Sequence, residues 1–178
     1  MSTVDLMLLG ALMAKPMNAY EMKKNMESRN IKSWVKISSP SIYKNLIALN
    51  KKGYLDGEIV KEGEMPEKTI YSINEKGQSY FMHLMEKYSE EPGMVYIDFI
   101  AFIANLHNVE PDRGLVMIKN LQSRLSEEKK CIQSNIEAKK EFAPFRAISI
   151  IELYDNMYSL FFDFSEKIYK EFAEKGGL

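Results

Sequence analysis

The sequence contains few of the residues on which catalysis and metal binding depend. It has one cysteine, Cys131, and two histidines, His83 and His107, which lie far apart in the chain. A single cysteine cannot form an internal disulfide, and these three residues do not have metal-ligand spacing. A glycine-rich phosphate loop, a nucleophile elbow and paired carboxylates in an apolar setting are also missing. We therefore predict a protein that is not an enzyme and that uses no metal and no cofactor.

Long hydrophobic segments are missing as well. The longest apolar runs, within residues 6–14 and 96–106, are much shorter than the roughly 20 residues of a membrane span. The first residues lack the basic start and the cleavage site of a signal peptide. With 46% hydrophobic and 28% charged residues, the composition is typical of a folded globular protein. These features predict a cytoplasmic protein without a membrane partner.

Helical patterns dominate the start of the chain. Apolar residues at helical spacing predict three helices, at about residues 6–13, 19–28 and 39–52. Asn18 and Glu21 form a capping-box pattern before the second helix. For the third helix, Ser39 can serve as the N-cap, Pro40 fits the first turn, and Gly53 fits the position after the last turn.

A hairpin follows the three helices. Residues 55–61 and 68–73 are rich in strand-forming side chains and are separated by an acidic turn, and a further helix is predicted to end near residue 88. Three helices followed by a hairpin are the plan of a winged helix-turn-helix. That fold places its third helix in the major groove of DNA and its hairpin, the wing, beside the backbone or the minor groove.

A block of positive charge coincides with this plan. Between residues 15 and 52 there are nine lysines and arginines and two glutamates, a net charge of +7, whereas the whole chain carries −1. Such a block suits binding to phosphates, and a solvated helical face is the simpler alternative. Serine, lysine and asparagine side chains can also bond to base edges. Charge and helix position predict DNA contacts by Lys23, Lys24, Ser39, Ser41, Lys44 and Asn45.

The second half of the chain is predicted to be helical. Three helices are expected there, at residues 94–106, about 111–142 and 145–174. The break at residues 90–93 predicts a domain boundary, with one domain at 1–91 and the other at 92–178. The expected fold is therefore mainly α with a small β-hairpin, and its second domain is an antiparallel helical dimerisation domain.

Dimerisation is expected from the apolar stripe on the long helix. This stripe is narrow, which is typical of a helix–helix seam, and a core within one chain is the alternative. The last helix adds many large apolar residues to this small domain. The predicted dimer contacts are Leu115, Ile118, Leu121, Leu125, Ile132, Tyr154, Phe161 and Phe162.

Several motifs in the first half carry a family resemblance. They are Leu8-Leu9-Gly10-Ala11-Leu12 and the segments 16–22, 41–46, 49–55 and 66–77. In order and spacing, about residues 5–88 resemble the PadR family of transcriptional regulators. The helical second half is similar to the branch of that family with a large C-terminal dimerisation domain.

This resemblance implies further site residues. Tyr43 fills the tyrosine of the recognition-helix motif, which in such proteins holds a DNA phosphate, and Tyr20 fills the tyrosine at the start of the second helix. Lys68 fills the basic position of the wing, and Lys61 is the other cation beside the wing tip. The tip departs from the basic pattern of the family because three glutamates between these lysines make it acidic.

Two functions are compatible with these patterns. The first is a sequence-specific DNA-binding regulator that acts as a homodimer on a palindromic operator, and represses because a dimer on a promoter blocks polymerase. Family relatives often respond to small aromatic compounds, so Phe99, Phe102 and Tyr158 are candidates for an effector pocket, with a plain helical core as the alternative. The second function is a winged-helix adaptor that binds protein and not DNA, which the acidic wing favours.

Overall fold

The computed structural model describes residues 3–61, 63 and 67–175. The chain divides into two compact units, Met1–Val95 and Tyr96–Leu178. This division and the predicted boundary after residue 91 both fall in the segment 91–97, which has no helix or strand. No helix in the described part of the chain combines the length and the hydropathy that a membrane span requires.

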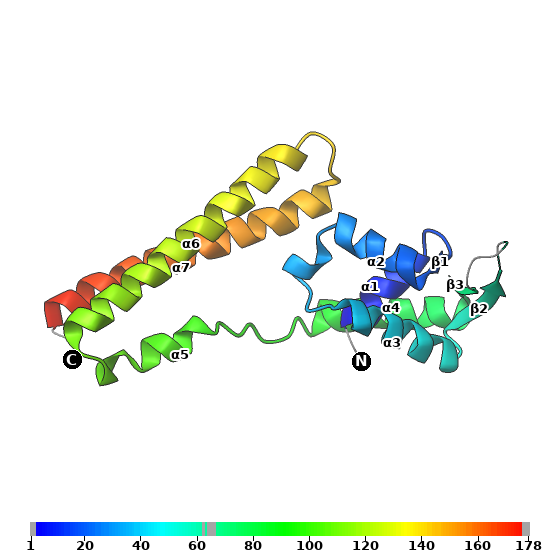
Figure 1. The fold of residues 1–178 in the computed structure, drawn as a ribbon, viewed down its shortest axis with the longest axis horizontal. Helices are drawn as coiled ribbons and strands as arrows, with labels where there is room; N and C mark the ends of the chain where they lie inside the picture. The colour runs from blue at the N-terminus through cyan, green and yellow to red at the C-terminus, as the bar shows by residue number, and fades with distance from the viewer. Residues whose placement is uncertain (1–2, 62, 64–66, 176–178) are drawn as a thin grey trace. The chain divides into compact units, whose positions relative to one another are not determined.

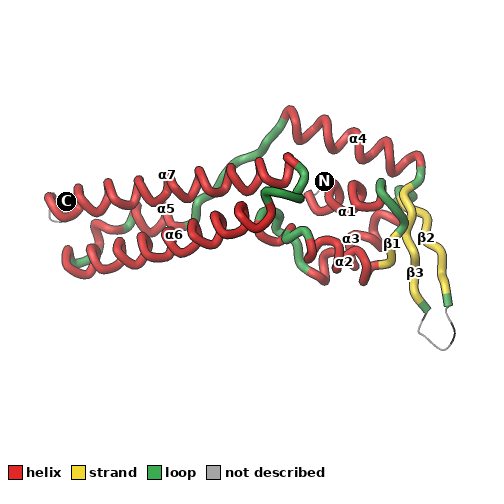
Figure 2. The backbone as a smooth tube through the Cα atoms, turned by 90° about the horizontal axis from the view of Figure 1, so that it is seen from above, coloured by secondary structure: helices red, strands yellow, loops and turns green. Residues whose placement is uncertain are grey.

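The first unit packs helices against a small sheet (Figure 1). Its helices are α1 (Thr3–Leu12), α2 (Ala19–Ser28), η1 (Ile31–Ser33, a 3-10 turn), α3 (Ser39–Lys51) and α4 (Glu75–Glu90). Its strands are β1 (Met17–Asn18), β2 (Leu55–Val60) and β3 (Lys68–Ile73). The sheet is antiparallel in the order β1-β3-β2. The predicted β2–β3 wing therefore has a third strand, the two-residue β1, paired with β3 (Figure 2). The sequence pattern did not predict β1.

Polar side chains fix where the helices of the first unit begin. Asn18 Oδ1 accepts a hydrogen bond from Glu21 N at 2.9 Å, and Asn18 N donates to Glu21 Oε2 at 2.9 Å. The predicted capping box is therefore formed. At the start of α4, Asn74 Oδ1 accepts from Gly77 N at 3.0 Å. An added Cβ at Gly77 would lie against the Tyr54 carbonyl, so only glycine allows this approach between α4 and the residue before β2.

The start of α3 corrects one expectation, because the N-cap is Ser38 and not Ser39. Ser38 has an extended backbone (φ −123°, ψ 156°), and its Oγ accepts from Ser41 N at 3.3 Å. Its own N donates to Ser41 Oγ at 2.9 Å. Ser39 and Pro40 therefore occupy the first turn of the helix. Of the two adjacent serines, only Ser38 lies three residues before Ser41, and this spacing completes the reciprocal pair.

One continuous apolar core holds the first unit together. Sixteen of its described apolar residues are buried, among them Leu9 of α1, Leu46 of α3 and Leu84 of α4. Because α1 contacts both α3 and α4, it forms the centre of this core. The core therefore fixes α3 by one side only.

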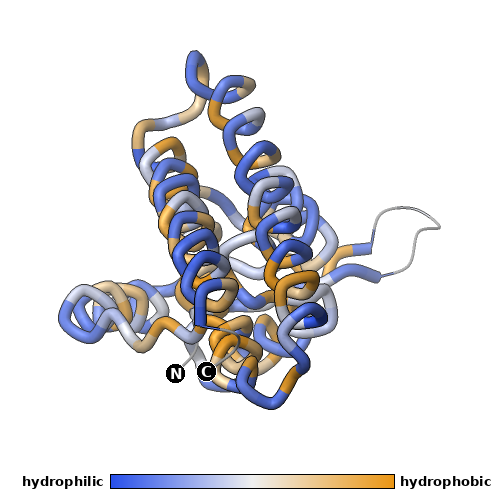
Figure 3. Tube along the Cα trace, turned by 90° about the vertical axis from the view of Figure 1, so that its left-hand side faces the viewer, coloured by the Kyte–Doolittle hydropathy of each residue, from blue (hydrophilic) through white to orange (hydrophobic). Residues whose placement is uncertain are grey.

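The second unit is built on two long helices that lie side by side (Figure 1). They are α6 (Pro111–Lys139) and α7 (Phe145–Lys175), and the shorter α5 (Phe99–Ala104) and η2 (Leu106–Asn108) precede them. Hydrophobic positions recur along both long helices (Figure 3). In this unit three described apolar residues are buried, Leu106, Ile118 and Leu125. An added Cβ at Gly114 would lie 2.5 Å from the Phe172 ring, so the two helices approach closely there.

The predicted helix over residues 94–106 is wrong in extent. Helix α5 begins only at Phe99, and Met94, Val95 and Tyr96 lie outside any helix with most of their surface exposed. Their apolar side chains do not pack against the core of the described residues. Without such packing a short helix gains little stability, and apolar spacing alone cannot show this.

Candidate nucleic-acid interface

Helix α3 has one buried face and one open face. Ile42, Leu46 and Leu49 are at most 1% exposed and pack into the core. Five other side chains of α3 are exposed, and their spacing places them on one side of the helix. We call this side the open face of α3, and it consists of Pro40, Tyr43, Lys44, Ile47 and Lys51.

The predicted recognition residues occupy different parts of α3. Tyr43 and Lys44 lie on the open face, whereas Ser39 and Asn45 are half-buried at its sides. The Ser41 hydroxyl donates its only proton to Ser38 O at 2.7 Å and accepts from Ser38 N at 2.9 Å. Ser41 can therefore offer a DNA base only a lone pair, and it cannot donate to a phosphate.

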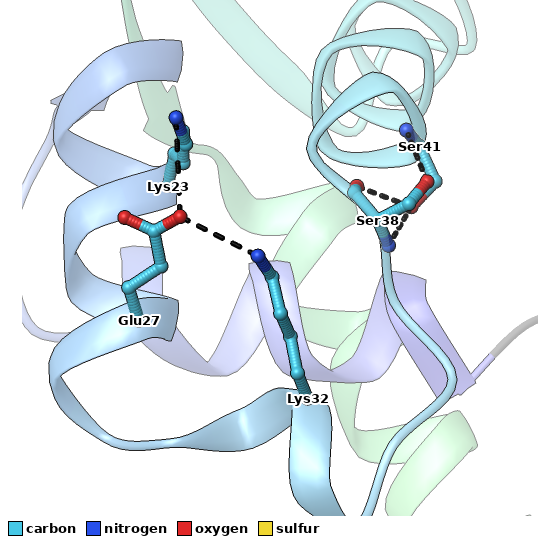
Figure 4. Close-up of polar contacts among 5 residues, drawn as sticks. All are labelled: Lys23, Glu27, Lys32, Ser38 and Ser41. Atoms are coloured by element: carbon cyan, nitrogen blue, oxygen red, sulfur yellow. Dashed lines mark hydrogen bonds and ion pairs between the residues drawn. The ribbon is translucent and has the colours of Figure 1, made fainter.

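A carboxylate lies among the cations of the first unit (Figure 4). Glu27 on α2 is 3.8 Å from Lys23 Nζ and 3.5 Å from Lys32 Nζ, both measured to its Oε1 atom. All three side chains are partly exposed to solvent. Exposed ion pairs contribute at most about 1 kcal/mol, so a phosphate can compete with Glu27 for these lysines. The charge of Lys23 is nevertheless partly compensated before any ligand binds.

Two further predicted contacts lie next to each other on α2. Lys24 Nζ lies 4.9 Å from the centre of the Tyr20 ring, in a cation–π arrangement. Both side chains are exposed. The pair presents one positive charge and one phenolic hydroxyl, and both groups can donate to a phosphate oxygen.

The described part of the wing carries the two predicted lysines. Lys61 follows β2 and is exposed, and Lys68 begins β3 opposite Val60. Of the three tip glutamates, Glu67 is exposed, whereas Glu62 and Glu64 lie outside the described residues. The predicted acidic tip is therefore described only at its C-terminal edge.

The predicted dimer residues fall into two groups. Ile118 and Leu125 are buried within the chain itself, so they fill the interior of the α6–α7 pair. The other six are only partly buried, and for them a contact with a second chain stays a prediction; they are Leu115, Leu121, Ile132, Tyr154, Phe161 and Phe162. Sequence reasoning missed Leu153 and Leu160, which are exposed on α7. Their seven-residue spacing was the available signal.

The aromatic residues proposed for an effector pocket pack against neighbouring rings. Phe99 meets Phe161 edge-on, with ring centres 5.3 Å apart, and Tyr158 meets the same ring at 5.9 Å. Burial raises the pKa of the Tyr158 hydroxyl. The second unit has a hollow of about 210 Å³, lined by residues of α5, η2 and α7 such as Ile103 and Phe172. Phe99, Phe102 and Tyr158 do not line it.

Comparison with known proteins finds a family that part of the chain resembles and solved structures with a similar fold. Residues 8–83 match the transcriptional regulator PadR-like family. PadR of Bacillus subtilis in complex with operator DNA is 14% identical, with a TM-score of 0.81 over 97% of this chain and 98% of that chain. The same protein in complex with p-coumaric acid is 12% identical, with a TM-score of 0.75 over 95% and 94%.

A third solved structure covers the chain to the same extent. The PadR-like regulator BC1756 of Bacillus cereus is 20% identical, with a TM-score of 0.73 over 97% of this chain and 99% of that chain. No curated protein sequence matches the chain significantly. At these identities the structures show a shared fold, a winged helix followed by long C-terminal helices.

Proposed function

We propose that this chain, whose residues 8–83 form a PadR-like domain, is a transcriptional regulator that binds double-stranded DNA as a homodimer. The observation that carries the proposal is the open face of α3. It presents Tyr43, Lys44 and Lys51 on a helix that the core holds from the opposite side. The helix lies in the segment with a net charge of +7, which is complementary to the negative charge of the phosphate backbone.

Two copies of α3 are needed to read an operator. One recognition helix contacts only a few base pairs, whereas two helices about 34–36 Å apart read both halves of a palindrome. Support for a dimer comes from the second unit, where α7 carries large apolar residues that its own chain covers only in part. A dimer bound over a promoter would repress by excluding polymerase. A small aromatic effector bound to the second unit would release it, an expectation supported by the p-coumaric acid complex of the Bacillus subtilis protein.

Selection from a random pool of DNA duplexes tests the proposal without a known operator. We expect the protein to enrich an inverted repeat whose half-sites are about one helical turn apart. Mass photometry or sedimentation of the complex should then show two chains on each selected duplex. Failure to enrich any sequence in low and moderate salt would contradict the proposal.

Three substitutions in the first unit locate the contacts. Tyr43→Phe and Lys44→Ala should weaken binding to the selected duplex because each removes a donor from the open face. Lys24→Ala should weaken binding equally for all sequences and lower the slope of log affinity against log salt by about one. Lys130→Ala is the matched control, since it removes an exposed lysine from the second unit. If the three variants bind the duplex as tightly as the Lys130→Ala control, the assignment of DNA contacts to these side chains is contradicted.

A protein-binding adaptor is the second candidate. Ile59 on the wing strand β2 is 70% exposed, and acidic residues follow it along the wing. An exposed apolar residue beside carboxylates suits a basic protein surface better than DNA. This candidate predicts that the selection enriches nothing, while Ile59→Asp abolishes capture of a protein from the native cell extract.

A further inference from the structure

Ile47 is an apolar residue on the open face of α3, where the fold does not require one. Its side chain is 48% exposed, although its neighbour Leu46 is completely buried in the core. Ile47 is not among the partly buried residues that pack against that core. A β-branched side chain also stabilises a helix less than lysine or glutamate would at this exposed position. Packing and helix propensity therefore leave Ile47 unexplained.

The charges around Ile47 indicate what kind of partner it meets. Lys44 lies one helical turn before it and Lys51 one turn after it, both exposed on the same face. Two lysines that flank one apolar side chain suit a ligand that is anionic along its edges and has an apolar group between them. In the major groove of DNA, thymine is the base that presents such a group, its C5-methyl.

We propose that Ile47 is a specificity-determining residue that contacts a thymine methyl group in each half-site, an inference that rests on the proposed DNA binding by α3. The spacing is suitable: Lys44 and Ile47 are separated by about 4.5 Å along the helix axis, and base pairs are stacked about 3.4 Å apart. Ile47 therefore faces a base pair one or two steps from the one that Lys44 approaches.

The same side chain selects against other bases. Isoleucine has no hydrogen-bond donor or acceptor in its side chain, so it cannot pair with the major-groove atoms of guanine, cytosine or adenine. Placing it against those polar atoms would remove water from them without compensation. Ile47 thus contributes discrimination, whereas the lysines contribute affinity for any sequence.

Deoxyuridine tests the inference, because it differs from thymidine only by the missing methyl group. Each thymine of the selected duplex is replaced in turn, symmetrically in both half-sites, and binding is measured by fluorescence anisotropy. Loss of one buried methyl group corresponds to about a fourfold weaker affinity for each half-site. We expect this loss at one symmetric pair of positions, and no change for thymines outside the site.

Variants of Ile47 complete the test. Ile47→Ala should bind the thymine and uracil duplexes with equal affinity, and Ile47→Val should keep an intermediate preference. Met85→Ala is the matched control, because it shortens an apolar side chain of α4 that is also 48% exposed and should keep the full preference for thymine.

The outcomes separate this inference from the proposed function. If the unchanged protein binds the duplex but tolerates uracil at every position, the methyl contact is wrong while DNA binding stands. The same conclusion follows if Ile47→Ala retains the preference for thymine. If the unchanged protein binds no duplex, the proposed function itself fails.

Discussion

The two units of this chain bury their apolar residues to very different degrees. Among the described residues, sixteen apolar side chains of the first unit are buried, but only three of the second. Helix α7 has 31 residues and many large apolar side chains, yet the only buried residue in it is the polar Ser165. The first unit therefore completes its core within one chain.

This difference separates the tasks of the two units. A rigid core behind α3 holds the open face in one geometry, as specific contacts to bases require. The partly covered helices of the second unit suit an interface, where apolar surface is removed from water only when chains associate. The stability of the second unit should then depend on protein concentration, and that of the first should not.

The largest expected effect is the loss of a buried side chain from the first unit. Leu46→Ala should lower the free energy of unfolding by about 2–5 kcal/mol, because it leaves a cavity in a closed core. Denaturation followed by the fluorescence of Trp34, the only tryptophan, reports on this unit. Ile47→Ala is the control at the adjacent position and should change stability little. Equal effects of the two substitutions would mean that this core is not closed.

The second prediction concerns concentration. If two chains complete the second unit, each tenfold increase in protein concentration should stabilise it by about 1.4 kcal/mol per dimer. Far-ultraviolet circular dichroism follows the helices of both units, whereas Trp34 fluorescence follows the first. Only the dichroism transition should contain a phase that moves with concentration. Unfolding curves that are independent of concentration would remove the distinction between the units.

The smallest expected effect concerns how the helices begin. In the first unit, side chains cap α2, α3 and α4, whereas the residue before α6, Glu110, makes no such bond. Ser38→Ala should therefore cost about 1 kcal/mol, while Glu110→Ala should stay within about 0.5 kcal/mol. Ser39→Ala, one position away, is the direct control for the identity of the cap. A larger loss of stability for Ser39→Ala than for Ser38→Ala would instead identify Ser39 as the N-cap of α3.

The sequence predicted the elements whose ends carry local chemical signals. The capping box of Asn18 and Glu21 and the turn at Gly53 lie where they were expected, and both strands of the wing were predicted within one residue of their ends. The strand β1 was missed because two residues have no periodicity. The helix over residues 94–106 was extended too far because apolar spacing cannot show whether a partner surface exists.

The candidate interface was predicted for its polar residues only. Tyr43 and Lys44 were identified because they lie off the apolar stripe of α3, and they are exposed. Ile47 was missed because an apolar residue in a helix is indistinguishable from core until its exposure is known. The local bonding of Ser41 was equally invisible, since it depends on which of two serines begins the helix.

Asn18 belongs to two elements at once. Its backbone pairs with Ile70 of the wing, and its side chain caps α2. Lengthening the chain before Met17 would alter only the turn after α1, whereas one inserted residue just after Asn18 would rotate α2 by about 100° relative to the wing. Tolerance to insertion and deletion should therefore change abruptly across the two residues of β1, from permissive before Met17 to nearly forbidden after Asn18.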